Sequence, residues 1–265
     1  MGKILRGVRT AMLASLGLLA GPIAAHASLM FGGIATGQGA GVSASNIVLT
    51  VQRDPTESGC VAWNGSADVI GSTACPGGLS PAITGGDEKT GISQTQTRTV
   101  GLTGVESGES LVVVLNVSEP LGESLFTIGN LSLTVYSPTG TVLFNTGNLF
   151  GAPVTLDGSL QTVGTLGFGF LLDSAQAAAI SPFICTDASV TGCAGIANLA
   201  NADNRIGLAA LLTNTQGANE IFFVADAANV SLPVPEPATI LIVSTGLALL
   251  GLTRRRRKVV SRSLV

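Results

Sequence analysis

Residues 124–145 read SLFTIGNLSLTVYSPTGTVLFN, and this stretch decides the fold class. Two runs rich in β-branched, aromatic and leucine side chains, 124–137 and 140–145, flank the sequence SPTG at 137–140. Proline suits the second position of a tight turn and glycine its last position, so the pattern predicts a hairpin of two antiparallel strands.

Similar strand signals recur at short intervals along the chain. One short helix is predicted over Ala175–Ile180, with Asp173 and Ser174 as its cap and Pro182 as its end. About six to eight strands with one short helix predict an all-β fold, a single β-sandwich of jelly-roll or immunoglobulin-like type. The further strand signals lie at 46–53, 94–102, 110–118, 162–172, 206–213 and 220–230, and 54–91 is expected to be mainly loop.

The first 27 residues have the three-part layout of a secretory signal peptide. A basic start precedes the apolar stretch 11–20. Ala25 and Ala27 then fit the small-x-small rule for cleavage by signal peptidase, which predicts Ser28 as the first mature residue.

The last 32 residues combine an extended element, an apolar run and a block of positive charge. Prolines fix φ and lack a backbone donor, so the extended element stays accessible. The apolar run 238–253 is short for a bilayer core of about 30 Å, and it is expected to form a hydrophobic transmembrane helix only with help from its flanks. The positive-inside rule places the basic block and the tail 259–265 in the cytoplasm. The extended element is Val234, Pro235, Glu236 and Pro237, and the basic block is Arg254, Arg255, Arg256, Arg257 and Lys258.

This order and spacing over 233–258 closely resemble the PEP-CTERM sorting signal of Gram-negative bacteria. The resemblance implies processing by an exosortase, a membrane-embedded cysteine transpeptidase or protease that removes the tail near Pro-Glu-Pro. It also implies transient anchoring in the inner membrane, followed by the cell surface or extracellular matrix. An ordinary membrane anchor accounts for the apolar run and the arginines, but not for a Pro-Glu-Pro placed directly against so short a span.

Between the two ends, the glycine-rich segment 28–45 lacks periodicity and is expected to be a flexible lead-in. Residues 46–232 then form one ectodomain. Over 28–237 the chain has four basic residues against all 16 of its acidic ones, a net charge of −12. Nucleic acid is therefore excluded as a partner, because phosphate binding needs clustered Lys and Arg.

The sole histidine, His26, leaves with the signal peptide. Its loss excludes Ser-His-Asp and Cys-His catalysis and the usual His-containing zinc sites. The four cysteines form two local pairs, Cys60 with Cys75 and Cys185 with Cys193. Short separations in polar loops of an exported chain indicate disulfides, with crossed pairing or free thiols as the alternatives.

Asn201 and Asp203, with Asp187 in the nearby cysteine loop, are the best oxygen-ligand cluster for a metal, namely calcium. Asn and Asp are also common turn formers, and the sequence favours that interpretation. Trp63 is either a platform for stacking sugars or a side chain that packs on the first disulfide. A glycosidase needs a carboxylate pair, and the candidates, none of which stands out from ordinary strand-end acids, are Glu106, Glu109, Glu119 and Glu123.

These observations predict an exported, non-enzymatic structural or adhesive protein of an exopolysaccharide-associated layer, such as a biofilm matrix. Exopolysaccharide or other matrix proteins are the expected partners, and no cofactor is expected. A calcium-dependent carbohydrate- or matrix-binding module is the first alternative. A polysaccharide-active enzyme that uses carboxylates alone is the second.

Overall fold

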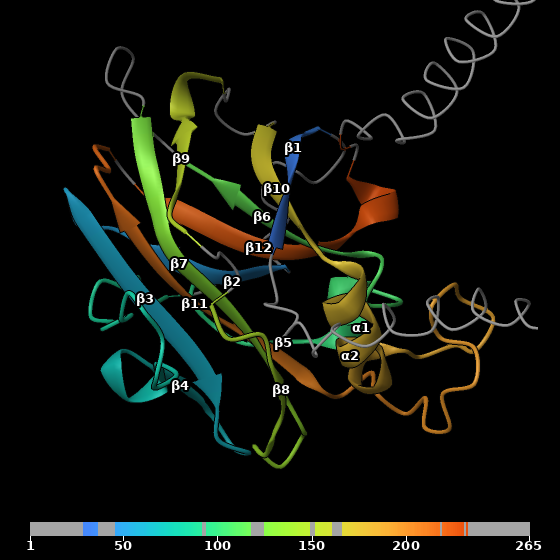
Figure 1. Ribbon diagram of the computed structural model, residues 1–265. Helices are drawn as coiled ribbons and strands as arrows, with labels where there is room; N and C mark the ends of the chain where they lie inside the picture. The colour runs from blue at the N-terminus through green and yellow to red at the C-terminus, as the bar shows by residue number, and fades with distance from the viewer. Residues whose placement is uncertain are drawn as a thin grey trace, which may run out of the picture.

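The computed structural model describes residues 29–36, 46–91, 94–117, 125–148, 152–160, 166–217, 219–230 and 232. Within these residues the chain forms two sheets whose strand pairs are all antiparallel (Figure 1). The first sheet has the order β1-β10-β6-β12-β2, with β1 at Leu29–Thr36, β10 at Leu166–Leu172, β6 at Leu111–Asn116, β12 at Glu220–Asp226 and β2 at Ile47–Val51.

The second sheet is built around the order β4-β3-β11-β7-β8. Two short strands extend it, since β5 pairs with β11 and β9 with β7. Its bounds are β4 at Asp68–Ile70, β3 at Thr56–Trp63, β11 at Arg205–Thr213, β7 at Leu125–Tyr136, β8 at Val142–Asn145, β5 at Arg98–Thr99 and β9 at Val154–Asp157.

One hydrophobic core is shared by the two sheets. Phe126 of β7 and Phe168 of β10 meet across it with ring centroids 5.5 Å apart, and both side chains are almost fully buried. Inward residues of β2, β6 and β12 join β7 and β11 residues in the same cluster, so neither sheet could be buried without the other. The all-β prediction is confirmed.

The hairpin that opened the sequence argument is present as β7 and β8. Gly140 has φ 87° and donates its N–H to the Ser137 carbonyl, while the Ser137 N–H returns to the Thr141 carbonyl. The strand signals at 46–53, 110–118, 162–172, 206–213 and 220–230 correspond to β2, β6, β10, β11 and β12.

Three regions differ from the sequence expectation. Residues 29–36 form the edge strand β1 inside the segment expected to be a flexible lead-in, because β10 supplies backbone pairing that a glycine-rich sequence does not signal. The expected loop 54–91 contains β3 and β4. The expected strand 94–102 is reduced to β5, followed by the short helix α1 at Val100–Thr103.

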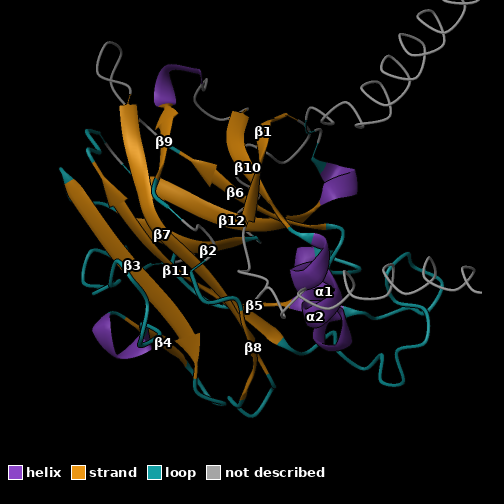
Figure 2. Cartoon of the chain, in the orientation of Figure 1, coloured by secondary structure: helices purple, strands orange, loops and turns teal. Residues whose placement is uncertain are grey.

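Helix α2 spans Ser174–Ile184, so Pro182 lies inside it and the predicted end at this proline is wrong (Figure 2). Asp173 caps the first turn by accepting from the Gln176 N–H, as predicted. The last turn persists because Ile184 is fully buried and the Cys185 N–H bonds the Ser181 carbonyl. Proline so near the end removes only one helical hydrogen bond. Short 3₁₀ turns lie at Ser72–Ala74, Gly158–Leu160 and Ala227–Asn229.

In the described part of the chain, no helix has the length and apolar character needed to cross a membrane. The predicted hydrophobic helix at 238–253 and the signal peptide 1–27 lie outside the described residues.

Candidate functional site

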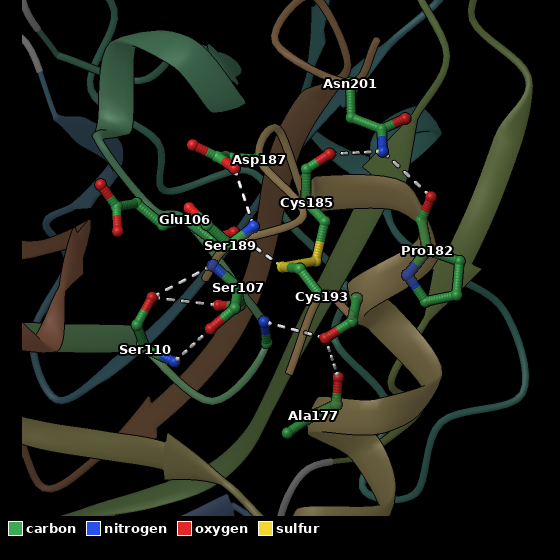
Figure 3. Close-up of a disulfide and its surroundings, with 12 residues drawn as sticks. Glu106, Ser107, Ser110, Ala177, Pro182, Cys185, Asp187, Ser189, Cys193 and Asn201 are labelled. Atoms are coloured by element: carbon green, nitrogen blue, oxygen red, sulfur yellow. Dashed lines mark hydrogen bonds between the residues drawn. A yellow bond between two sulfur atoms is a disulfide. The ribbon is translucent and has the colours of Figure 1, made fainter. Parts of the chain in front are cut away.

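Asn201, one of the three predicted metal ligands, caps the C-terminus of α2. The Asn201 amide, buried with 3% of its surface exposed, donates to the carbonyls of Pro182, Cys185 and Asn198 at 3.0, 2.9 and 3.2 Å. The last carbonyls of a helix have no partner inside the helix. Asn201 therefore supplies donors where the helix leaves acceptors (Figure 3).

Asn204 completes this cap. Its amide donates to the Phe183 carbonyl at 2.8 Å and to the Asn201 side-chain oxygen at 3.1 Å. The backbone between the two asparagines also closes a turn, from the Asn204 N–H to the Asn201 carbonyl at 3.0 Å. Asn201 and Asn204 thus cap the helix, which the sequence interpretation did not predict, and they close a turn, the role that competed with calcium binding in the sequence analysis.

Asp187 and Asp203 do not join this cap. Asp187 accepts from the Ser189 N–H at 2.8 Å within its own loop, and both residues are exposed. The Ser189 backbone N–H, together with the Ser189 side chain, lowers the pKa of the Asp187 carboxyl. Within the described ranges no three His, Cys, Asp or Glu side chains gather closely enough to hold a metal ion.

A disulfide joins Cys185 and Cys193 directly after α2, with the Cα atoms 5.7 Å apart. The other disulfide joins Cys60 of β3 to Cys75, with a Cα separation of 5.1 Å. Both local pairings were predicted and are confirmed. Figure 3 shows the first-named bridge beside the turn at 107–110, and the Cys193 sulfur lies 3.3 Å from the Glu106 carbonyl oxygen.

The turn at 107–110 packs directly on α2. The Gly108 N–H donates to the Ser181 hydroxyl at 3.1 Å, and that hydroxyl donates to the Ala177 carbonyl at 2.7 Å. A Cβ at position 108 would lie 2.1 Å from the Ala177 carbonyl oxygen, so only glycine allows this approach.

Two of the carboxylate candidates for a glycosidase pair lie at this turn. Glu106 precedes the turn and Glu109 lies within it, and both residues are exposed. Glu119 and Glu123 lie outside the described residues.

A groove of about 640 Å³ lies beside β4 and the segment before β5. Most of its side chains carry hydrogen-bonding groups, including Asp68, Gln96 and Arg98. The remaining lining residues are Ile70, Thr90, Gly91 and Thr95.

Two of the body's four basic residues stand at or next to this groove. The Arg98 Nε donates to the Ile47 carbonyl at 2.6 Å. The pKa of Arg98 is lowered, chiefly by burial; the nearby Asp68 carboxylate partly opposes this decrease, and the positive charge of Arg205 adds to it. The Arg205 Nε donates to the Thr97 hydroxyl at 2.8 Å, and Thr97 in turn bonds Asp68.

Trp63 is committed to this same network. The guanidinium carbon of Arg205 lies 4.0 Å from the Trp63 ring centroid, a cation–π contact. The Trp63 indole N–H donates to the Pro138 carbonyl at 2.9 Å. Its ring therefore packs on Arg205, which neither the sugar-stacking nor the disulfide-packing interpretation predicted. A signal for the groove did exist, because Arg98 and Arg205 are half of all the positive charge in an acidic body.

The C-terminal end of the described chain is packed against the first sheet. A Cβ on Gly169 of β10 would lie 2.4 Å from a Leu232 methyl, and one on Gly32 of β1 would lie 3.1 Å from another. Leu232 thus occupies a space that two glycines leave open on neighbouring strands. The described part of the chain ends at this contact.

The family model of the PEP-CTERM protein-sorting motif matches residues 233–258, directly after Leu232. The match confirms the predicted sorting motif and implies an exosortase as processing partner. The protein is therefore an exported one with a membrane-anchoring C-terminal signal. No curated protein and no solved structure matches the chain.

Proposed function

We propose that this protein is a non-enzymatic structural or adhesive component of an exopolysaccharide-associated layer, built as a single β-sandwich. An exosortase delivers it there by removing the tail near Pro235-Glu236-Pro237. The observation that carries the proposal is the sorting motif at 233–258, which begins one residue after the packed Leu232.

The chemistry of the body supports this assignment. Two disulfides close loops within a chain that is otherwise held by one shared core, which suits an oxidising environment outside the cytoplasm. The net charge of −12 over 28–237 favours solubility in a hydrated, cation-rich matrix. Once the signal peptide before Ser28 and the C-terminal tail are removed, the ectodomain is the part of the protein that contacts this matrix.

Mass spectrometry of the protein from its native host tests the delivery step. We expect the form outside the membrane fraction to begin at Ser28 and to lack the peptide that follows the Pro-Glu-Pro region. Glu236→Ala should retain the tail and hold the protein in the membrane fraction, whereas Ser261→Ala, in the segment 259–265, should be processed normally. An intact tail on the released wild-type protein would refute processing.

The groove beside β4 supports a second candidate, a carbohydrate- or matrix-binding module. Hydrogen-bonding side chains along an open groove suit the hydroxyl groups of a polysaccharide. Gln96→Ala, inside the groove, should weaken retardation of the protein in gels that contain neutral or uronate-bearing polysaccharides. Gln52→Ala, which is not among the groove residues, is the matched control. Equal migration of both variants with and without polysaccharide would remove this candidate.

A further inference from the structure

Two fully buried glutamates lie on the inner faces of the two sheets. Glu57 of β3 pairs with Leu212 of β11, and Leu212 belongs to the shared core. Glu220 of β12 pairs with Val51 of β2, and Val51 also belongs to the core. Directly paired residues lie on the same face of a sheet, so both glutamates point between the sheets. Neither side chain has any exposed surface.

The same end of the core receives both glutamates. Glycine at position 59, two residues after Glu57 on the inner face, is so close to Val51 that a Cβ there would lie 2.3 Å from a Val51 methyl. Val51 is the residue opposite Glu220. Register therefore places Glu220 opposite Val51, and packing places Glu57 two residues from the glycine that contacts Val51.

Two crossings between the sheets run next to each other at this end. Residues 52–55 link β2 to β3, and 214–219 link β11 to β12. The Thr215 N–H donates to the Pro55 carbonyl at 3.2 Å, and the Gly217 N–H donates to an Asp54 carboxylate oxygen at 3.1 Å. Each crossing thus leads into a strand that carries one buried glutamate.

Several buried side-chain oxygens at this end accept no hydrogen bond from the described residues. The Glu57 Oε2, the Thr215 hydroxyl and the Asn219 side-chain oxygen are buried and find no hydrogen-bond partner among the described residues. Glu57 and Thr215 have no exposed surface. Buried polar groups of native proteins are normally satisfied, and a buried carboxylate without compensation is strongly unfavourable.

The nearest arginine does not neutralise Glu57. The Arg53 backbone N–H donates to Glu57 Oε1 at 3.1 Å, but its guanidinium is 74% exposed and pairs with Asp87 at 3.2 Å. Within the described residues, no Lys or Arg side chain forms an ion pair with Glu57.

We propose that Glu57, Thr215, Asn219 and Glu220 form a calcium site that joins the two sheets at this end. Carboxylate, amide and hydroxyl oxygens are the donors that calcium prefers, and the ion takes six to eight oxygen ligands in all. Zinc is disfavoured, because it prefers nitrogen and sulfur ligands and the described cysteines are all in disulfides. This site is separate from Asn201, Asp203 and Asp187, and it does not depend on the sorting tail.

Thermal unfolding of the mature protein, purified from its native host and stripped with a chelator, tests the site. Extracellular calcium modules bind with Kd of about 0.1–1 mM, so about 10 mM calcium should raise the Tm by about 3–10 °C. Glu57→Gln keeps the shape and removes the charge. This variant should lose the calcium response and unfold at or above the Tm of the stripped wild type.

Two further variants make the result decisive. Thr215→Val removes one ligand oxygen at constant shape and should weaken calcium binding about tenfold, which also covers the case in which Glu57→Gln does not fold. Asp187→Asn should respond to calcium as the wild type does. A response lost in Asp187→Asn but kept in Glu57→Gln would place calcium elsewhere. A wild type whose Tm does not respond to calcium would refute the site.

Discussion

Replacing Asn201 by alanine removes the cap on the C-terminus of α2. The lost side chain donates to three carbonyls at 2.9–3.2 Å and accepts from the Asn204 amide at 3.1 Å. Each net hydrogen bond contributes about 0.5–1.5 kcal/mol, and a buried group left unsatisfied costs about 1–3 kcal/mol. The Asn201 amide has only two hydrogens for its three acceptors, so we expect a loss of about 3 kcal/mol of unfolding free energy.

This loss is measurable by circular dichroism during heating and during titration with urea. For a domain of about 200 residues it corresponds to a decrease in Tm of about 6–12 °C. Asn198→Ala is the matched control, because Asn198 is exposed and its side chain accepts only from the Ala200 N–H. We expect a Tm change of about 2 °C or less for this control.

Asn201→Asp separates capping from metal binding at the same position. An ionised carboxylate only accepts hydrogen bonds, so it would face the carbonyls of Pro182 and Cys185 without any donor. We expect Asn201→Asp to be less stable than Asn201→Ala, with or without calcium. Capping would be refuted by an Asn201→Ala protein as stable as the wild type, or by an Asn201→Asp protein that calcium stabilises.

Three further predictions concern the same ectodomain. Gly108→Ala should lower the Tm by several degrees, because its Cβ would lie 2.1 Å from the Ala177 carbonyl oxygen. Gly77→Ala is the control and should leave the Tm unchanged, because there is open space around position 77. Equal Tm values for the two variants would contradict the close packing at Gly108. Burial raises the pKa of Tyr136, partly opposed by a hydrogen bond with Thr134, so its absorbance change near 295 nm should occur above pH 10 in the folded protein and near pH 10 in urea. Tyr136 is the single tyrosine of the chain, so the stability that its raised pKa contributes is present below the unfolded pKa and lost as the pH rises through the folded one. The pKa of the Asp187 carboxyl is lowered chiefly by the Ser189 N–H, so its NMR titration should lie below that of a free aspartate. The titration should move up in Ser189→Pro, which lacks that donor. The small stability that Asp187 contributes above its unfolded pKa should be lost as the pH falls through its folded pKa.

The strands that sequence reasoning found are rich in β-branched, aromatic and leucine side chains or are bounded by explicit turns. The strand signal at 124–137 and the SPTG turn identified β7 and its hairpin with β8. Strand β3 also buries both faces, with Val61 toward the core and Cys60 toward another cluster, but few of its residues are typical strand formers. Its polar and small residues show no alternation, so 56–63 reads as loop until β11 is placed beside it.

The end of α2 and the role of Asn201 could not be predicted from a local sequence pattern either, because they depend on contacts between residues far apart in the sequence. Pro182 is a correct signal for a helix end in an isolated segment. Here Asn201 and Asn204, up to 21 residues away, satisfy the carbonyls around Pro182. The sequence shows the asparagines, but not that α2 ends in front of them.

By itself the sequence determined the cysteine pairs close in the chain and the sorting motif at 233–258, and it predicts the signal peptide at 1–27. These features are read along the chain by enzymes or formed between near neighbours, so they need no knowledge of the fold. The tertiary structure decided which polar residues are structural and which are left over. Asn201 is a cap, whereas Glu57 is buried in the core with one carboxylate oxygen that has no hydrogen-bond partner among the described residues, because strand register between distant segments controls what each side chain faces.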